Sequence, residues 1–349
     1  MHRVIGERDL ADTPFSAEEA RALYRDMVRA RRFDERALAL QRRGWMSGYP
    51  PYKGQEASQI GAAHAMQASD WLFPTYRSNG MQIARDVPMS DVLLFRRGFP
   101  EYESDHDVPN FPQAVPIATQ IPHATGAGMA MNYRGEDGKA ALCYFGDGAT
   151  SEGDFHEGLN FAGVFDAPVV FFCENNNWAI SLPRGQQTAA DSIAQRAEAY
   201  GMMGGQVDGN DPLAVREFVE SALESARDGS PVLVESLTYR QGAHTTSDDP
   251  DRYRDAESDL PEWRTRDPLE RYEAYLFEQD AITEEYVDTI HEEADEELDD
   301  AIETAENTEP EDVADVFEHV YDEIPDGLRE QRAFMEAFAA EHDVMELDH

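Results

Sequence analysis

The chain has 349 residues, of which 71 are acidic and 29 are basic, so its formal net charge is −42. Such a surface repels nucleic acid and anionic membranes, and neither is expected as a partner. Because 41% of the residues are hydrophobic and many lie in long runs, the chain should fold rather than stay disordered. A net charge of this size is typical of a halophilic protein, whose carboxylates keep water and counter-ions at the surface.

The sequence contains no sign of export or of membrane insertion. The amino terminus lacks the apolar stretch of a secretory signal, and no window reaches the ~18 apolar residues of a membrane helix. The two cysteines, Cys143 and Cys173, each lie in an apolar run, which predicts two buried free thiols in a reducing compartment. A redox switch between them is the alternative. Together these features favour a cytoplasmic protein.

The first predicted element is a helix over residues 16–43. Ser16 can cap its amino terminus, acidic residues follow in the first turn, and apolar residues recur at helical spacing. A second helix is expected over 55–67. A short strand over 70–76 and a helix over 88–97 follow.

The next stretch, residues 98–113, is rich in proline and acidic side chains and is predicted to be an irregular loop. After it, residues 118–133 carry glycine and alanine at helical spacing. Glycine weakens a helix by roughly 1 kcal/mol relative to alanine, but it is tolerated where another backbone must come close. We therefore expect this helix to pack tightly.

The central region carries the clearest pattern. Two continuous apolar runs, residues 140–145 and 168–173, flank a predicted helix over 153–165. Runs without alternation are typical of strands covered on both faces, as in a parallel sheet. Strand, helix and strand in this order predict a right-handed βαβ unit. A helix over 213–227 and a strand over 231–235 continue the pattern.

The remainder of the chain is expected to be polar loop and acidic helix. Residues 241–255 are predicted to form a polar loop, and residues 284–306 a long surface helix. We infer an α/β fold, doubly wound around a mostly parallel sheet. Its parts would be a helical N-terminal extension (1–50), an α/β domain (51–260) and an acidic helical C-terminal region (261–349).

Polar residues follow both strands of the βαβ unit. Asp147 lies in the Gly-Asp-Gly sequence at 146–148, after the first strand, and three asparagines at 175–177 follow the second. Neighbouring parallel strands lie about 4.8 Å apart and end at one edge, so Asp147 and Asn176 should lie side by side. A carboxylate oxygen, an amide oxygen and a backbone carbonyl near Trp178 suit Mg²⁺, whose other ligands would be water and phosphate.

The backbone of the same motif suits a diphosphate. Gly146 and Gly148 permit special dihedral angles and let a diphosphate approach the backbone closely. The helix that begins near residues 151–154 points its amino terminus at this edge, which favours an anion. The asparagine pair is either 175–176 or 176–177, and the middle asparagine belongs to both.

The segment 146–181 resembles the thiamine diphosphate motif of the α subunit of the E1 component of 2-oxo acid dehydrogenases. The resemblance spans roughly residues 20–335 and also includes residues 54–57, 76–77, 206–212 and 239–250. It implies a thiamine diphosphate-binding fold, with Mg²⁺ and thiamine diphosphate as cofactors. It also implies an α2β2 heterotetramer with an E1 β subunit, which supplies the glutamate that activates the cofactor ring, and acyl transfer to lipoyl-E2.

The resemblance further implies site residues. Tyr76 and Arg77 match the diphosphate anchors, which suits an arginine because its fork of donors matches phosphate oxygens. Ile117 matches the apolar residue that supports the bent cofactor between its rings, although without the resemblance it would be assigned to the core. His244 matches the histidine near the reacting centre, and it could donate to the diphosphate or to the acyl intermediate. The full expected set of cofactor contacts is Tyr76, Arg77, Ile117, Gly146, Asp147, Gly148, Ala149, Asn176 and His244, with Asp147, Asn176 and Trp178 on the metal.

The resemblance leaves the substrate open. Pyruvate is the first expectation and a branched-chain 2-oxo acid the second, each decarboxylated oxidatively. The alternatives are an acetoin dehydrogenase α subunit and a degenerate assembly subunit without turnover. The loop 98–113 faces the substrate in relatives, but here Glu101 falls near a histidine that they carry, and His106 does not align with it. Thr245 and Ser247 lie where animal relatives are phosphorylated, and they are expected to be ordinary polar residues.

Overall fold

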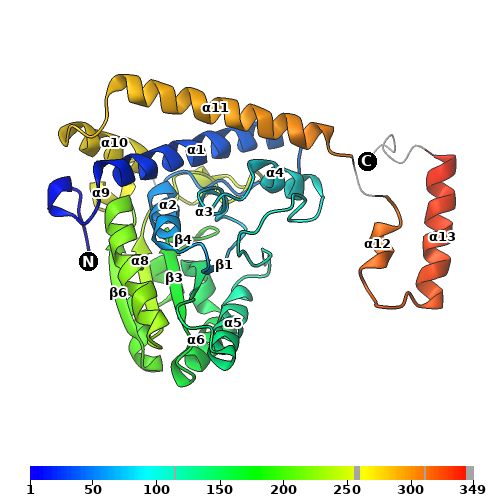
Figure 1. The fold of residues 1–349 in the computed structure, drawn as a ribbon, viewed down its shortest axis with the longest axis horizontal. Helices are drawn as coiled ribbons and strands as arrows, with labels where there is room; N and C mark the ends of the chain where they lie inside the picture. Colours follow the sequence, from blue (N-terminus) through cyan, green and yellow to red (C-terminus); the bar gives the residue numbers. More distant parts are fainter. Residues whose placement is uncertain (114, 255–259, 310–311, 343–349) are drawn as a thin grey trace. The chain divides into compact units, whose positions relative to one another are not determined.

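The computed structural model describes residues 1–113, 115–254, 260–309 and 312–342. Its centre is a parallel five-stranded sheet in the order β1-β2-β3-β7-β6, with helices on both faces (Figure 1). By their contacts the residues divide into two compact units, Met1–Glu303 and Thr304–His349, and the sheet lies in the first. The strands of the sheet are β1 (Trp71–Phe73), β2 (Ala141–Gly146), β3 (Val169–Asn175), β6 (Met203–Asp208) and β7 (Val232–Leu237).

The helices of the first unit surround this sheet. Between β3 and β6, the short antiparallel pair β4 (Trp178–Ala179) and β5 (Leu182–Pro183) precedes the one-turn helix α7 (Arg184–Gln187). The other helices are α1 (Ala17–Arg42), α2 (Glu56–Ala65), α3 (Asn79–Ile83), α4 (Met89–Arg97), α5 (Gln120–Arg134), α6 (Gly153–Val164), α8 (Pro212–Arg227), α9 (Glu262–Thr265), α10 (Pro268–Glu278) and α11 (Glu284–Asn307). The second unit holds α12 (Asp315–Glu318) and α13 (Asp326–Glu341).

The helices and strands predicted from the sequence are present, most with small shifts at their ends, but the strand predicted over 70–76 forms only at Trp71–Phe73. The loop 98–113 contains no helix and no strand, and its one ladder contact is an isolated bridge from Asn110 to Leu72. Strand β6 was missed, because two glycines interrupt its apolar pattern and only two of its six residues are buried. It exists because it pairs in parallel with β7.

One face of the sheet packs against α5 and α6. Phe145, Phe171 and Cys173 are buried in the cluster of apolar side chains that these two helices complete. The register places Phe145 opposite Cys173, and Cys143 opposite Phe171, so the two cysteines are offset along their strands. Both thiols are free and buried, which confirms that part of the prediction.

The small residues of α5 and α6 permit a close approach. A Cβ atom on Gly128 would lie 2.8 Å from the Cγ2 atom of Val169, and one on Gly158 would lie 2.7 Å from the Cγ2 atom of Ile121. Real Cβ atoms do not come so close to other heavy atoms, so a larger residue at either position would push the helix away. The tight packing predicted for this helix is confirmed.

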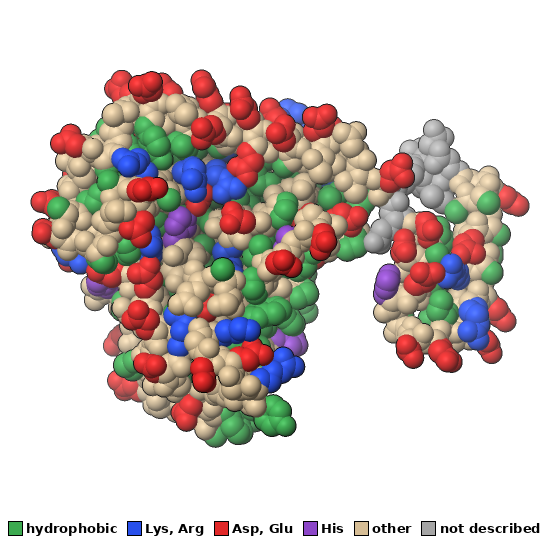
Figure 2. All heavy atoms as spheres, viewed as in Figure 1, with side chains coloured by type: hydrophobic (Ala, Val, Ile, Leu, Met, Phe, Trp, Pro, Cys, Tyr) green, Lys and Arg blue, Asp and Glu red, His purple; other side chains and the backbone are tan. Residues whose placement is uncertain are grey.

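Helix α1 begins with a capping box in which Ser16 and Glu19 exchange hydrogen bonds. Along its length α1 lies beside the acidic helix α11 (Figure 1). Three arginines of α1 pair with carboxylates of α11: Arg29 with Glu297, Arg32 with Asp295 and Arg36 with Asp299. Figure 2 shows many acidic side chains over the visible surface of the molecule.

The three-part division predicted from the sequence stays a prediction. Helix α1 from the predicted N-terminal extension packs with α10 from the predicted C-terminal region, and both belong to the first compact unit. No helix among the described residues is long and apolar enough to cross a lipid bilayer.

Candidate functional site

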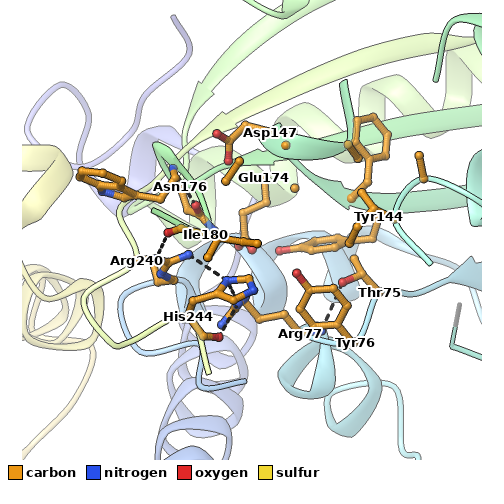
Figure 3. Close-up of a pocket in the computed structure, with 18 of the residues that line it drawn as sticks. Thr75, Tyr76, Arg77, Tyr144, Asp147, Glu174, Asn176, Ile180, Arg240 and His244 are labelled. Atoms are coloured by element: carbon orange, nitrogen blue, oxygen red, sulfur yellow. Dashed lines mark hydrogen bonds between the residues drawn. The ribbon is translucent and has the colours of Figure 1, made fainter. Parts of the chain in front are cut away.

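A cavity of about 260 Å³ opens at the carboxyl ends of β2 and β3 (Figure 3). This is the edge at which open parallel sheets bind ligands. The wall includes each of the residues that the sequence nominated: Tyr76, Arg77, Ile117, Gly146, Asp147, Gly148, Ala149, Asn176, Trp178 and His244. Segments far apart in the chain thus meet in one place.

Asp147 directly follows β2, and its side chain is almost completely buried. Its Oδ2 atom accepts a hydrogen bond from Gln187 Nε2 at 2.9 Å, but its Oδ1 atom is buried without any hydrogen-bond partner. Burial raises the pKa of this carboxyl group to about 6. Leaving a buried carboxylate oxygen unmatched costs free energy, so the site favours a group that this oxygen can bind.

The structure distinguishes between the three consecutive asparagines. Only Asn176 reaches the cavity, where Trp178 N–H donates to its Oδ1 atom at 3.2 Å. Asn175 instead donates to the buried carboxylate of Glu235, and its Oδ1 atom accepts from the backbone of Asn177. Both pairings predicted from the sequence contain Asn176, and the geometry selects it among the three.

Among the described residues, no three His, Cys, Asp or Glu side chains are grouped so that they could hold a metal ion. The ligand set expected here is of another kind, because it has one carboxylate and takes its other protein oxygens from an amide and a backbone carbonyl. Such a set suits Mg²⁺, which keeps several water or phosphate oxygens. The unmatched Oδ1 atom of Asp147 on the cavity wall fits that requirement.

Two arginines give the opposite wall its positive charge. Figure 3 shows Arg77 and Arg240 converging on His244, whose Nδ1 atom lies 3.1 Å from the first guanidinium group and 3.2 Å from the second. Their other hydrogen bonds go to uncharged acceptors, among them the carbonyl groups of His244 and Ile180. Burial, with the charges of Arg77 and Arg254, lowers the pKa of Arg240 to about 10. An anion in the cavity would reverse this effect.

His244 is neutral in these surroundings. Burial, together with Arg77 and Arg240, lowers the pKa of its imidazole to about 4, against the smaller opposite effect of Asp248. Because a guanidinium group donates and cannot accept, Nδ1 must be the accepting nitrogen. The proton of the neutral ring is therefore assigned to Nε2, from the hydrogen-bond network.

The loop that carries His244 is held in place by its own polar residues. The Asp248 carboxylate accepts from the backbone N–H of His244 at 2.6 Å and from the Tyr253 hydroxyl at 2.5 Å. Thr245 and Ser247 contact each other through their hydroxyl groups. The side chains of Asp248, Tyr253, Thr245 and Ser247 thus hold the loop without lining the cavity themselves.

Two aromatic or apolar side chains complete the wall near the cations. Tyr76 lies edge-on to the His244 ring, with 6.2 Å between the ring centroids. Ile117, which sequence alone would assign to the core, is 45% exposed and lines the cavity. An apolar side chain left open to a cavity is available to a ligand.

The two glycines at 146 and 148 do not use the positive φ that glycine permits. Neither has a positive φ, because Gly146 ends β2 in extended conformation and Gly148 continues into a 3-10 turn. Gly148 is required for space instead, since a Cβ atom there would lie 2.9 Å from that of Ala179. The turn precedes α6, which begins only at Gly153, and Glu152 at its N-cap also lines the cavity.

Several residues of the wall were missed from the sequence. Glu174 is buried on β3, its Oε1 atom has no partner, and burial raises its pKa to about 8. The Tyr144 hydroxyl and Gln120 Oε1 are also buried without partners on this wall. Glu174 directly follows the apolar run 168–173, and this position in the sequence was a signal that could have located it.

The loop 98–113 contributes no residue to the cavity wall. The Glu101 carboxylate turns inward instead, where it accepts from the backbone N–H of Gln113 at 2.6 Å, and burial raises its pKa. His106 lies 3.7 Å from the Asp91 carboxylate. Within this chain alone, these side chains serve to hold the loop in place.

Comparison with known proteins gives a consistent result. The model of the family "Dehydrogenase E1 component" matches residues 24–314. The 3-methyl-2-oxobutanoate dehydrogenase subunit alpha of Mycobacterium tuberculosis is 45% identical over 336 residues, covering 93% of this chain and 89% of the relative. The pyruvate dehydrogenase E1 component subunit alpha of Staphylococcus aureus is 39% identical over 317 residues, covering 90% and 85%. The protein of the same name from Staphylococcus epidermidis has the same identity and coverage.

Proposed function

The chain belongs to the dehydrogenase E1 component family, and we propose that it is the α subunit of a 2-oxo acid dehydrogenase E1. The reaction is the thiamine diphosphate-dependent oxidative decarboxylation of pyruvate or a branched-chain 2-oxo acid, with acyl transfer to lipoyl-E2. The observation that carries the proposal is the pairing, in one cavity, of an unmatched carboxylate oxygen on Asp147 with two arginines that have no carboxylate partner there.

The metal end of the cofactor would be held by Asp147, Asn176 and the backbone carbonyl of Trp178. When bound, thiamine diphosphate supplies the electron sink for decarboxylation, and Mg²⁺ ties its diphosphate to the protein. The Asp147 carboxylate, buried with a raised pKa, becomes a better ligand when a cation lies against it, because the cation favours the ionised form. A Cβ atom on Gly146 would meet no other atom within 4 Å, so the space beside this motif is open.

The anionic end would be held by Arg77 and Arg240, with Tyr76 beside them. Each guanidinium group offers a fork of donors that matches phosphate oxygens. In a chain with a net charge of −42, these local cations offset the repulsion that an incoming diphosphate would otherwise meet. A bound anion would offset the burial and the neighbouring positive charges that together lower the pKa of Arg240.

His244 acts as a hydrogen-bond donor in this proposal. Its Nδ1 atom is occupied by the two guanidinium groups, so Nε2–H is the group that can face a ligand. A low pKa keeps the ring neutral at neutral pH, and a neutral ring donates one proton without adding to the positive charge of the wall. Ile117 supports the cofactor between its rings.

The site is proposed to be completed by an E1 β subunit in an α2β2 assembly. No glutamate of this chain lies in a context that matches the ring-activating carboxylate, so the isolated chain should show no turnover. Both groups of relatives support the same reaction class, and the 45% and 39% identities leave pyruvate and branched-chain 2-oxo acids together as substrates. We also propose that the acidic surface adapts the protein to high salt.

The test is calorimetry on the chain co-expressed with its β partner in concentrated KCl. Mg²⁺–thiamine diphosphate should release heat on binding, and Asp147→Ala should abolish that heat while the heterotetramer stays intact. An intact wild-type heterotetramer without heat of binding would contradict the proposal and would favour a degenerate assembly subunit. Ferricyanide-coupled decarboxylation of pyruvate, branched-chain 2-oxo acids and acetoin then separates the substrates.

A further inference from the structure

Each of the two proposed side-chain ligands of the metal is held by a glutamine from another part of the chain. Gln187 Nε2 donates to Asp147 Oδ2 at 2.9 Å. Asn176 Nδ2 donates to Gln55 Oε1 at 2.7 Å. Neither glutamine lines the cavity, so both act on the ligands from behind.

Gln187 is fixed by two hydrogen bonds from a single amide nitrogen. Besides Asp147, the nitrogen donates to the carbonyl oxygen of Leu182 at 3.2 Å. Both of its protons are therefore used, and the amide cannot exchange its nitrogen and oxygen without losing both bonds. Leu182 belongs to the short pair β4–β5, and Gln187 ends α7 directly after it, so the amide is tied to a local structure.

The consequence concerns the direction of one oxygen atom. The Asp147 carboxylate can rotate about its last bond, and this rotation changes the direction in which the lone pairs of its free oxygen point. The Gln187 bond occupies Oδ2 and leaves Oδ1 as the one unmatched oxygen. Mg²⁺ demands near-ideal octahedral geometry, so a ligand oxygen held in one direction binds it better than a carboxylate that is free to rotate.

Asn176 is oriented in the same manner. The backbone N–H of Trp178 donates to its Oδ1 atom, while its Nδ2 atom donates to Gln55. The amide oxygen is thereby assigned to the side that bears the metal ligands, and its second lone pair stays available. Gln55 is fully buried in the core, whereas Gln187 lies in a partly exposed loop, so Gln187 is the residue that can be changed with least damage.

We propose that Gln187 is a positioning residue for the metal site, which it serves by holding Asp147 so that Oδ1 faces the cation. The inference rests on the proposed function, because the metal belongs to the thiamine diphosphate site. The role of Gln187 is indirect. Its own oxygen, Oε1, is buried without a hydrogen-bond partner.

The experiment compares Gln187→Leu with Gln186→Leu in the heterotetramer. Both changes remove an amide of similar size from α7, but Gln186 is exposed and forms no hydrogen bond with Asp147. Mn²⁺ serves as the probe, and its free concentration is measured by electron paramagnetic resonance at saturating thiamine diphosphate. Gln187→Leu should weaken Mn²⁺ binding by about 10–100-fold. Gln186→Leu should stay within about twofold of the wild type.

A second readout separates orientation from general damage. Ca²⁺ accepts flexible coordination, whereas Mg²⁺ does not. Competition against Mn²⁺ should therefore show that Gln187→Leu loses more affinity for Mg²⁺ than for Ca²⁺. An equal loss for both ions would overturn the positioning role, as would unchanged Mn²⁺ binding in Gln187→Leu.

The outcomes also separate this inference from the proposed function. If the wild-type heterotetramer does not bind Mn²⁺ with thiamine diphosphate, the proposed function itself fails. If the wild type binds and Gln187→Leu binds equally well, only the inference fails. Should Gln187→Leu not assemble, Gln187→Asn takes its place in both measurements, since it keeps the amide but is one carbon too short to reach Asp147.

Discussion

Two groups of arginines in this molecule have opposite surroundings. On α1, Arg29, Arg32 and Arg36 each face a carboxylate of α11. In the cavity, Arg77 and Arg240 face each other across His244 and donate to uncharged acceptors. The hydrogen bonds that Arg77 and Arg240 donate go to no carboxylate, in a chain with 71 acidic residues. An anion bound in the cavity would supply the negative charge that this pair lacks.

The pKa values express the same contrast. The hydrogen bond to Asp295 raises the pKa of Arg32, whereas burial lowers that of Arg240 to about 10. A cation whose pKa is raised stabilises the folded chain by its pairing. A lowered pKa means that keeping the group charged in the folded chain costs free energy, and a bound anion would offset this cost. The first group should thus serve stability, and the second should serve binding.

The greatest loss is expected for Arg240→Met. This change removes the charge but keeps an apolar chain of similar length, and thiamine diphosphate binding should weaken by about 100-fold. The stability of the cofactor-free chain should change by less than about 1 kcal/mol, because three hydrogen bonds are lost while the burial of a charge and the repulsion from Arg77 are relieved. Calorimetric titration and thermal melting of the same preparation measure both. Strong binding by the variant would remove the distinction between the two groups.

The reciprocal variant is Arg29→Gln. Arg29 is 17% exposed and contacts both Asp26 and Glu297, so its loss leaves the nearly buried Asp26 with fewer cations. The melting temperature should fall by about 2–4 °C, while cofactor affinity stays unchanged. Arg29→Lys, which keeps the charge, is the matched control and should recover part of the loss. A variant that melts normally but binds the cofactor poorly would contradict the assignment.

The pH dependence of stability should reveal His244. Its pKa is about 4 in the folded chain and 6.5 without these neighbours, so between the two values the unfolded chain binds more protons. This contribution to stability is fully present above pH 6.5 and is lost as the pH falls towards 4. After solvent screening it should amount to about 1 kcal/mol. The free energy of unfolding of His244→Gln, measured with denaturant across this pH range, should depend less steeply on pH than that of the wild type. Equal dependence on pH in both proteins would refute the assignment.

The weakest effect concerns salt. Arg32 and Asp295 are both partly exposed, so their coupling in a double-mutant cycle should be about 0.5 kcal/mol in moderate salt. In concentrated KCl it should vanish, because the Debye length falls to about 3 Å at 1 M. Arg240 lies in a buried site, so salt should screen its attraction for the cofactor much less. Coupling that persists in several molar KCl would show that the α1–α11 pairs resemble the cavity arginines after all.

Sequence reasoning located the residues whose position follows from the chain itself. Asp147 and Asn176 directly follow neighbouring parallel strands, and the edge of the sheet brings such residues together whatever else the protein contains. Gln187 was missed for the opposite reason. Nothing in its neighbourhood in the sequence distinguishes it from Gln186, and only the folded loop decides which of the two amides reaches Asp147.

The same distinction applies to the fold. Strands β2, β3 and β7 are covered on both faces, so continuous apolar runs predicted them. Strand β6 lies at the edge with Gly204 and Gly205 in its centre, and local propensity there opposes a strand. The two glycines are required because neighbouring atoms would meet any Cβ, Ala194 O at 2.1 Å in the first case and Phe218 Cζ at 2.4 Å in the second. This requirement comes from contacts with residues elsewhere in the chain, so it produces no periodic pattern in the sequence.

The strand order also fixes a sequence of events during synthesis. Strand β7 lies between β3 and β6, although β6 precedes it in the chain. While the chain leaves the ribosome, β1, β2 and β3 can assemble in order, and with them the strand ends that carry Asp147 and Asn176. Strand β6 has no neighbouring strand until β7 has emerged. A nascent chain that stops before Val232 therefore carries the half of the sheet that bears Asp147 and Asn176 with an open edge, which is the aggregation hazard that a co-translational chaperone would have to cover.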